Sequence, residues 1–508
     1  MSLAVSRGLN VAVPLLFESS LPGLCGTRSA PHRFDEAAYD GRLGGLHRCD
    51  TIGLPELSEP QVMRHFVTLS AKNYCIDTGI YPLGSCSMKY NPRVNEKVAR
   101  LDGLANIHPN QPEGTVQGIL QIMYELGEAL KAITGMADIT LTPAAGAHGE
   151  LTGLMAIKKA LSEREERGRN IIIVPESAHG TNPASAVMCG FKVVSVQANK
   201  EGTVDMDVFK AILEKYEGKV AGMMLTNPNT LGIFEGEIKN MADLIHEQGG
   251  YFYMDGANLN ALMGNALVDD FGVDAMHINI HKTFSTPHGG GGPGGGPVVF
   301  SELLAPYCPI PKVVKNPDGS YHLMDEADAP DTTLGRVKGF AGQVGLMVRA
   351  LAYIKAMGAE GLTQASRDAI LNANYLQHEL TEGGLTAPFE GPNMHEFVLS
   401  DHYLKGTSVT TMDMAKGLLD AGHHPPTVYF PLVVSGAMLI EPTESEPLTS
   451  LDRFAGDLIG LADKAHGCQD DTCEMKSSPT LTPVRRCDEV GAAKNPVLRW
   501  VKPRGVDL

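Results

Sequence analysis

Between residues 116 and 300, short apolar runs alternate with stretches whose apolar residues recur every three or four positions. Several of the runs are apolar throughout, which is typical of strands buried on both faces of a sheet. Strands that alternate with helices usually pair in parallel. The sequence therefore predicts an α/β domain with a mostly parallel sheet covered by helices. Its strands are expected at 139–142, 171–174, 192–196, 220–225, 251–254, 275–280 and 297–300.

The clearest helix signal lies just before the first of these runs. Apolar residues from Val116 to Ile133 fall at spacings of three and four, which marks one face of an amphipathic helix, and Gly135 is expected to end it. Three regions follow from the pattern. An N-terminal extended arm is expected at 1–114, a large α/β domain at 115–330, and a small C-terminal α+β domain with a tail at 331–508.

Composition excludes several classes of function. The chain of 508 residues carries 59 acidic and 42 basic side chains, and its net charge of −17 argues against a nucleic-acid-binding surface. The apolar stretch Leu9 to Phe17 is too short for a membrane span and lacks a cleavage site, so no signal peptide is expected. Nine scattered cysteines fit a reducing compartment such as the cytoplasm, and Cys468 with Cys473 lacks a standard zinc spacing, so no metal site is expected.

In a parallel α/β sheet, ligands bind at the carboxyl ends of the strands. The turn that follows the first expected strand contains Gly146, Ala147 and His148 and leads into a helix. Free N–H groups at such a helix start can hold a phosphate, although a plain tight turn would look the same. His179, after the second strand, could stack on an aromatic cofactor or simply satisfy a loop carbonyl.

Asp255 and Ala257 follow the expected strand 251–254. A carboxylate at a buried strand end needs a cationic partner, and a protonated pyridine nitrogen would be one. Ala257 would leave room for a ring above Asp255. A metal ligand or a helix N-cap remains an alternative role for Asp255.

Lys282 is the most unusual residue of this set, because it comes two residues after the end of the apolar strand expected at 275–280. A lysine held in a confined site can lose its proton and form a Schiff base with a carbonyl group. Asn279 and His281 beside it could donate to a phosphate. Together, the phosphate turn, the stackable ring, the buried carboxylate and the lysine appear in the order that a pyridoxal phosphate site of the aspartate-aminotransferase type requires.

A glycine run follows Lys282, at 289–292 and 294–296. It lacks the Gly-Lys-Ser/Thr ending of a phosphate-binding P-loop, and Pro293 and Pro297 do not suit a dinucleotide-binding fingerprint. We expect these glycines to let the segment pass close to the cofactor or change shape as a lid.

Three segments, together with the residues around Lys282, resemble the glycine-cleavage P-protein family, glycine dehydrogenase (decarboxylating). The stretch from His281 to Gly294 is similar to that family's cofactor-lysine signature. The segments 83–92, 143–150 and 438–444 agree as well, apart from Ser87 where threonine is expected. The chain looks like the lysine-bearing subunit 2 of the split form, and the resemblance covers almost its whole length.

The resemblance implies the fold and the cofactor contacts. It implies a PLP fold type I architecture with a seven-stranded sheet, in which Lys282 forms the Schiff base with pyridoxal 5'-phosphate and Asp255 pairs with the pyridinium nitrogen. Ala257 and His179 would lie on the two faces of the ring, and Thr226 would reach the ring hydroxyl. The phosphate would be held by Gly146, Ala147 and His148 with Asn279 or His281. Tyr90, Asn91 and the turn at His108 either line the substrate channel or belong to an interface.

The implied reaction is decarboxylation of glycine, with transfer of the aminomethyl group to the lipoyl disulfide of H-protein. The implied partners are a homologous subunit 1, in a tetramer with two of each subunit, and lipoylated H-protein. Three rival hypotheses remain: an aminotransferase or a cysteine desulfurase on the same scaffold, and an inactive subunit that only supports its partner.

Overall fold

The computed structural model describes residues 12–26, 41–46, 48, 50, 52–288 and 294–501. Two compact units can be distinguished, one made of residues 79–476 and the other of residues up to 78 together with those from 477 onward. The second unit contains the helices α2 (Glu59–Lys72) and α14 (Glu489–Lys494). All predicted site residues belong to the first unit.

A seven-stranded sheet forms the centre of the first unit, in the order β1-β7-β6-β5-β4-β2-β3. Only β7 runs antiparallel to its neighbours, β1 and β6. The prediction of a mostly parallel sheet is therefore confirmed, and each of the seven expected runs overlaps one strand. Their bounds are β1 (Asp138–Thr140), β2 (Ile171–Pro175), β3 (Lys192–Val196), β4 (Val220–Thr226), β5 (Tyr251–Gly256), β6 (Ala275–Ile278) and β7 (Val298–Phe300).

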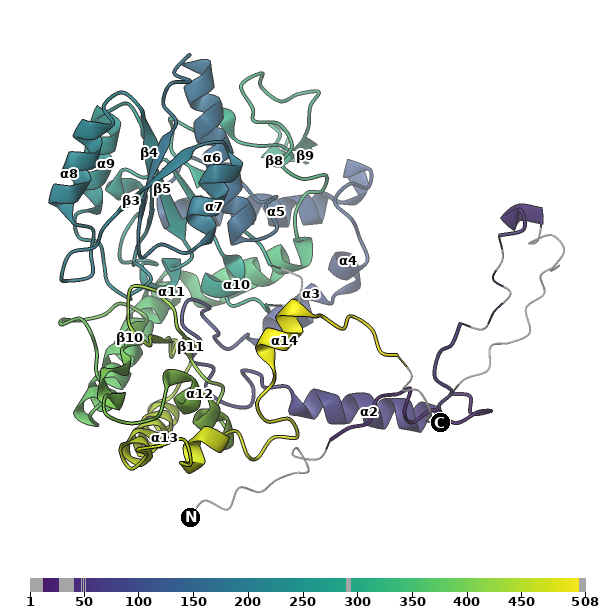
Figure 1. Ribbon diagram of the computed structural model, residues 1–508. Helices are drawn as coiled ribbons and strands as arrows, with labels where there is room; N and C mark the ends of the chain where they lie inside the picture. Colours follow the sequence, from purple (N-terminus) through teal and green to yellow (C-terminus); the bar gives the residue numbers. More distant parts are fainter. Residues whose placement is uncertain are drawn as a thin grey trace. The chain divides into compact units, whose positions relative to one another are not determined.

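Helices cover both faces of this sheet (Figure 1). Successive residues of a strand point to opposite faces, so Ile171 and Ile173 of β2 enter one core while Ile172 and Val174 enter another. The first core contains apolar side chains of α5 (Gln117–Thr134), α8 (Met206–Lys215) and α9 (Ile238–Glu247). The second is closed by α6 (Gly146–Glu163) and α7 (Thr181–Met188). This double cover explains why the strands are apolar throughout.

Local signals fix several helix ends. Gly135 ends α5 with a φ of 79°, a left-handed conformation that glycine adopts without a steric penalty, as the sequence predicts. Asp205 begins α8, because its carboxylate accepts the backbone N–H groups of Asp207 and Val208. By contrast, α6 begins at Gly146 after Ala145, which has no side chain that could cap the helix.

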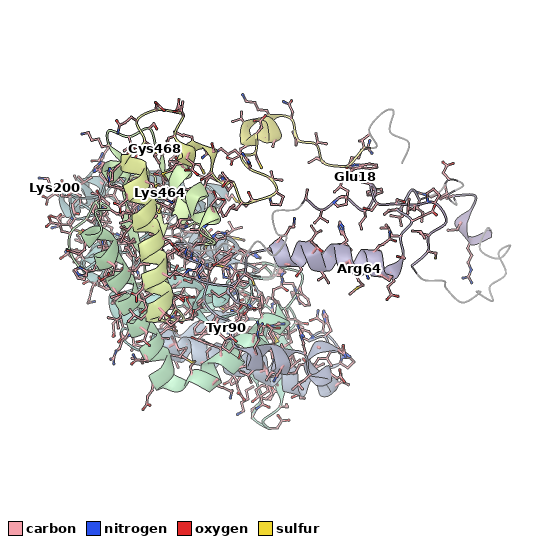
Figure 2. All side chains as sticks on the ribbon, turned by 90° about the horizontal axis from the view of Figure 1, so that it is seen from below. Glu18, Arg64, Tyr90, Lys200, Lys464 and Cys468 are labelled. Atoms are coloured by element: carbon pink, nitrogen blue, oxygen red, sulfur yellow. A yellow bond between two sulfur atoms is a disulfide. The ribbon has the colours of Figure 1, made fainter. Side chains whose placement is uncertain are left out.

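The C-terminal part of the first unit has its own apolar core. The long helix α11 (Val344–Glu382) breaks at Gly358 and leads from the large sheet to a three-stranded antiparallel sheet of order β10-β12-β11. The strands are β10 (Phe397–Leu399), β11 (Thr427–Val428) and β12 (Met438–Ile440), and the helices α12 (Thr411–Asp420) and α13 (Leu448–His466) pack with them. Lys464 lies in α13, and Cys468 lies just beyond its end (Figure 2).

Cys468 forms a disulfide with Cys473, which the expectation of reduced, dispersed thiols did not include.

Residues 79–114 contain α3 (Arg93–Ala99) and α4 (Asp102–Ala105), and Ala99 and Ile80 enter the two larger apolar cores. A hairpin of β8 (Lys312–Lys315) and β9 (Tyr321–Met324) precedes α11. None of the helices in the described ranges is long and apolar enough to cross a membrane.

Candidate active site

The carboxyl ends of β4, β5 and β6 bring together the first group of site residues. Thr226 pairs with Asp255 across β4 and β5, and Asp255 pairs with His277 across β5 and β6. All three side chains are buried. Parallel pairing thus places a hydroxyl, a carboxylate and an imidazole in one row at the edge where ligands bind in such sheets.

Asp255 is held as a carboxylate despite its burial. Its oxygens accept hydrogen bonds from Asn182 Nδ2 at 3.0 Å and from the backbone N–H of Ala257 at 2.9 Å, and His277 Nε2 lies 3.3 Å away. Burial by itself would raise the pKa of Asp255, but His277, these two donors and the charge of Lys282 together lower it below its ordinary value. The buried group is therefore ready to pair with a cation.

Three further residues, Tyr253, His277 and Glu150, fix the groups that contact Asp255, and none of them was predicted as a site residue. Tyr253 and His277 share a hydrogen bond of 2.7 Å between the phenol oxygen and Nδ1, which fixes the imidazole against Asp255. Glu150 accepts a hydrogen bond from the same Asn182 amide at 3.0 Å. His277 lies in the predicted strand β6. A histidine within so apolar a run was the sequence signal that could have indicated its place in the site.

Lys282 lies slightly further from the strand than predicted. The strand β6 ends at Ile278, and Lys282 lies in the short helix α10 (Ile280–Thr283), where its N–H donates to Asn279 O at 3.0 Å. The expected strand over 275–280 is therefore too long by two residues. The lysine is half-buried. Its charge acts to lower the pKa of Asp255 and of two glutamates in the C-terminal part, Glu396 and Glu441.

The start of α6 lies against Asn279. A Cβ placed on Gly146 would lie 2.5 Å from Asn279 Oδ1, so only glycine fits there without displacing that side chain. By helix geometry, the first N–H groups of α6, at Gly146, Ala147 and His148, have no acceptor within the helix. Asn279 is buried, and its Oδ1 has no hydrogen-bond partner among the described residues. This edge therefore presents free polar groups to a ligand.

The three histidines predicted for the site have different surroundings. Both ring nitrogens of His148 are engaged, with the Ala144 N–H at 3.2 Å and Val337 O at 3.1 Å. Burial, with the nearby charges of His288 and Lys282, lowers the pKa of His281 to about 3, so its imidazole is neutral. His179 is exposed, and its Nδ1 lies 3.0 Å from Thr181 Oγ1.

The glycine run is described only in part, because 289–292 lie outside the described residues together with Pro293. Gly296 donates its N–H to Pro143 O at 2.9 Å, and a Cβ on Gly296 would collide with the Ala145 carbonyl. The end of the run therefore passes directly beside the start of α6. This close approach requires glycine at position 296.

These residues fit pyridoxal phosphate on structural grounds. The ionised Asp255 suits a protonated ring nitrogen, and the free N–H groups of α6 suit a phosphate. Thr226 Oγ1 and Asn279 Oδ1 are buried polar atoms without a partner in the part of the chain that the structure describes. Such atoms are rare in native proteins, and a bound ligand would satisfy them.

The C-terminal part adds three buried ionisable side chains that the sequence analysis did not predict: His395, Glu396 and Glu441. One nitrogen of His395 and one oxygen of each carboxyl group lie within 4.8 Å of one another. The available signal was that these polar residues adjoin the apolar strands β10 and β12. Glu441 belongs to a segment that carries the family resemblance, but no role followed from it.

The residues expected to line a channel or an interface lie nearby. Asn91 Nδ2 donates to Ser285 Oγ at 3.4 Å, three residues beyond Lys282, while Tyr90 is exposed. His108 contacts the ring of Phe340, with 4.9 Å between centroids. Asn91 is thus connected to the lysine segment, whereas His108 packs against the loop before α11.

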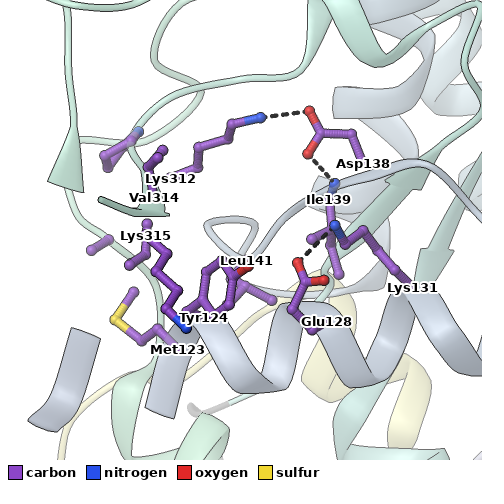
Figure 3. A pocket seen from close by; sticks show the side chains of 14 residues that line it. Met123, Tyr124, Glu128, Lys131, Asp138, Ile139, Leu141, Lys312, Val314 and Lys315 are labelled. Atoms are coloured by element: carbon purple, nitrogen blue, oxygen red, sulfur yellow. Dashed lines mark hydrogen bonds and ion pairs between the residues drawn. The ribbon is translucent and has the colours of Figure 1, made fainter. Parts of the chain in front are cut away.

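A separate cavity of about 270 Å³ lies at the β1 edge of the sheet, beside α5 and the β8–β9 hairpin (Figure 3). Lys312 pairs with Asp138 at 2.6 Å, and Lys131 pairs with Glu128 at 2.7 Å. None of the predicted site residues lines it. Two of the three lysines that line it are paired with carboxylates, and the cavity holds none of the residues expected to bind a cofactor.

Comparisons with known proteins agree with this geometry. Residues 147–291 match the family described as "Aminotransferase class-V", and residues 365–483 match "Glycine dehydrogenase, C-terminal domain". A crystal structure of glycine decarboxylase (P-protein) superposes with a TM-score of 0.69 over 86% of this chain and 100% of that one, and at 20% identity it shows the fold. The fold is accordingly that of the type I PLP enzymes.

Sequence relatives are much closer. The probable glycine dehydrogenase (decarboxylating) subunit 2 of Caldanaerobacter subterraneus is 51% identical over 96% of this chain and 99% of its own length. The protein of the same description from Caulobacter vibrioides is 50% identical over 98% of this chain and 94% of its own length. The chain therefore belongs to the family of glycine dehydrogenase (decarboxylating) subunit 2.

Proposed function

We propose that this chain decarboxylates glycine with pyridoxal phosphate and transfers the remaining aminomethyl group to the lipoyl group of H-protein. The observation that carries the proposal is the ionised, buried Asp255 beside Lys282, in a chain that matches glycine dehydrogenase subunit 2 over nearly its whole length. By its name, that relative is one subunit of a larger enzyme. The proposal therefore includes a homologous subunit 1, with two copies of each subunit, and a cytoplasmic location.

When bound, pyridoxal phosphate supplies an electron sink for the bond that breaks at the substrate carbon. Lys282 would hold its aldehyde carbon, and Asp255 would face its ring nitrogen. Thr226 would meet the ring hydroxyl, and Ala257 and His179 would cover the ring faces. The phosphate would be held by Gly146, Ala147, His148, Asn279 and His281.

The chain's own residues contribute charge and position. Asp255 stays ionised because His277 lies beside it and because Asn182 and the Ala257 N–H donate to it, so a proton on the facing ring nitrogen would be stabilised. The start of α6 offers unpaired N–H groups and the positive end of a helix dipole to an anion. The backbone N–H of Lys282 donates to the Asn279 carbonyl at 3.0 Å, which places the lysine in the turn that directly follows β6.

The rival reactions have less support. A cysteine desulfurase needs a reactive thiol, but burial raises the pKa of Cys86, the thiol within reach of the Lys282 charge, to about 11. Structures of NifS-like protein and cysteine desulfurase share 15% identity with this chain, so their similarity supports the fold and not the reaction. The presence of both Lys282 and Asp255 argues against an inactive scaffold.

The test uses this chain assembled with subunit 1, glycine and lipoylated H-protein. We expect exchange of labelled carbon dioxide into the carboxyl group of glycine, and mass spectrometry after borohydride reduction should locate a phosphopyridoxyl group on Lys282. Amino-group transfer without exchange would instead indicate an aminotransferase. An adduct on a different lysine would refute the assignment of the site.

A further inference from the structure

Glu396 and Glu441 are two buried carboxyl groups that face each other beside Lys282. Neither side chain is exposed to solvent. Glu441 accepts the backbone N–H of Ser87 at 2.9 Å and the Ser87 hydroxyl at 2.5 Å. Glu396 accepts the backbone N–H of Ser85 at 2.7 Å and the amide of Asn258 at 3.3 Å. Asn258 follows Asp255 by three residues, so Glu396 contacts the segment just beyond β5.

These contacts hold the segment 85–87 against the site. Ser85 and Ser87 both have positive φ values, 64° and 46°, which are uncommon for residues other than glycine. The two glutamates thus stabilise a turn that places Cys86 within reach of the Lys282 charge. A Gln at either position would keep a carbonyl oxygen for the backbone N–H groups, so the turn does not by itself require a carboxyl group.

The charged groups around the pair do not neutralise it fully. The charge of Lys282 lowers the pKa of both carboxyl groups. Glu444 raises the pKa of Glu441, but Glu444 is itself paired with Lys89 at 2.7 Å. His395 Nε2 lies 3.9 Å from Glu441, and burial lowers the pKa of His395 to about 3, so it is neutral. Two buried carboxyl groups with oxygens within 4.8 Å of each other cannot both ionise easily, so the pair keeps a proton near neutral pH.

The proposed reaction needs a place for one proton. Glycine arrives as an ammonium ion and ends on sulfur as a neutral amine, so its nitrogen releases a proton. The carboxylate leaves as carbon dioxide, and the carbon left behind forms a bond to one sulfur as the S–S bond breaks. The other sulfur keeps the bonding electron pair and needs a proton to become a thiol. The disulfide is reduced, the carbon is oxidised, and no net proton is drawn from water.

We propose that the Glu396–Glu441 pair, which holds one proton at rest, takes up the proton that the glycine nitrogen releases on its remaining carboxylate and delivers one proton to the leaving sulfur. This inference rests on the proposed function. It gives the C-terminal part of the chain a chemical role in the site, as the general acid for disulfide opening. It also explains why two carboxyl groups are buried together at a place where amides would support the same turn.

The test compares Glu441→Gln and Glu396→Gln in the holoenzyme, assembled with subunit 1. The control is Glu446→Gln, a neighbouring half-buried glutamate that is not part of the pair. Each protein transfers to the lipoyl group of H-protein or to an aromatic disulfide, whose leaving thiol is more acidic and needs less help from an acid. We expect transfer to the lipoyl group to slow about 100-fold in the two pair variants, a typical loss for a general acid. With the aromatic disulfide, their rates should return to near wild type.

A second readout does not depend on activity. In the cofactor-free protein at neutral pH, infrared spectroscopy should show a protonated-carboxyl band that weakens in either pair variant. Equal slowing with both acceptors, or no loss of the band, would overturn the proton assignment in favour of a purely structural role. If wild type releases no carbon dioxide with either acceptor, the proposed function itself is wrong, and the infrared band still reports separately whether the pair holds a proton.

Discussion

Asp255 and Glu441 are both buried carboxyl groups beside Lys282, yet their charge states differ. Asp255 faces His277, Asn182 and a backbone N–H, and its pKa is lowered although burial opposes this. Glu441 faces a second carboxyl group, and burial raises its pKa to about 7 even though Ser87 and Lys282 act in the opposite direction. Burial alone therefore does not decide the charge of a buried acid. Its immediate partners do.

Removing Lys282, the cation shared by both carboxyl regions, should have the largest effect. We expect Lys282→Ala to lower activity by about 10⁴-fold or more, the scale seen when a covalent nucleophile is lost. The fold should persist, because the side chain is half-buried and makes no ion pair within 4.0 Å in the described structure. Turnover together with circular dichroism checks this. An active Lys282→Ala protein would remove the basis for the site.

Asp255→Asn tests the ionised side of the comparison. An amide cannot stabilise a protonated ring nitrogen, so we expect turnover to fall about 100- to 1,000-fold, as when one preorganised electrostatic partner is removed. Because the pKa of Asp255 is lowered in the folded state, its contribution to stability is present above the unfolded pKa and is lost as pH falls through the folded value. The variant should therefore lose less stability than wild type on acidification, measured by urea unfolding. An unchanged acid response would contradict the ionised state of Asp255.

Glu441→Gln tests the protonated side. With a folded pKa of about 7 against an ordinary value of 4.5, the native state binds more protons than the unfolded state between these values. Stability should then fall as pH rises from about 4.5 to about 7, by about 3 kcal/mol for this group. Urea unfolding of the cofactor-free protein should show a flatter profile for the variant. The exposed Glu302→Gln serves as the control, and a profile as steep as wild type in Glu441→Gln would refute the raised pKa.

Asn182→Ala should give the smallest effect in this series. Its amide donates to both Asp255 and Glu150 at 3.0 Å, so its removal leaves two buried carboxylate oxygens with fewer donors. We expect a loss of about 1 to 3 kcal/mol in the free energy of unfolding, the typical cost of a buried unsatisfied group. The pKa of Asp255 should also rise toward that of an unpartnered acid. A variant with wild-type stability would show that water replaces the amide.

The sequence allowed much of the sheet to be predicted. Each expected run overlaps a strand, because parallel strands buried on both faces are apolar throughout, and this pattern can be recognised without knowing which strands pair. Strand ends were less certain: the run at 275–280 continues as apolar sequence into α10, so its composition could not show where the strand stops at Ile278. The positions of Asp255 and Lys282 near strand ends followed from the same pattern.

The C-terminal contribution could not be predicted in this way. Glu396 and Glu441 are far from Lys282 in the sequence. Glu396 precedes β10 and Glu441 follows β12, and both strands belong to the three-stranded sheet, not to the large sheet that leads to Lys282. Nothing local distinguishes a glutamate that will face solvent from one that will face another carboxyl group. The turn at Ser85 and Ser87 that satisfies them comes from a third segment, separated from both by more than three hundred residues.

By itself, the sequence determined the α/β architecture, the order of its strands along the chain and the identity of the lysine and aspartate, because periodicity and strand-end polarity are local properties. Only the tertiary structure decided which of the buried carboxyl groups is ionised. A pKa depends on the atoms within a few ångströms, and the atoms around Asp255 and Glu441 come from segments that only folding brings together.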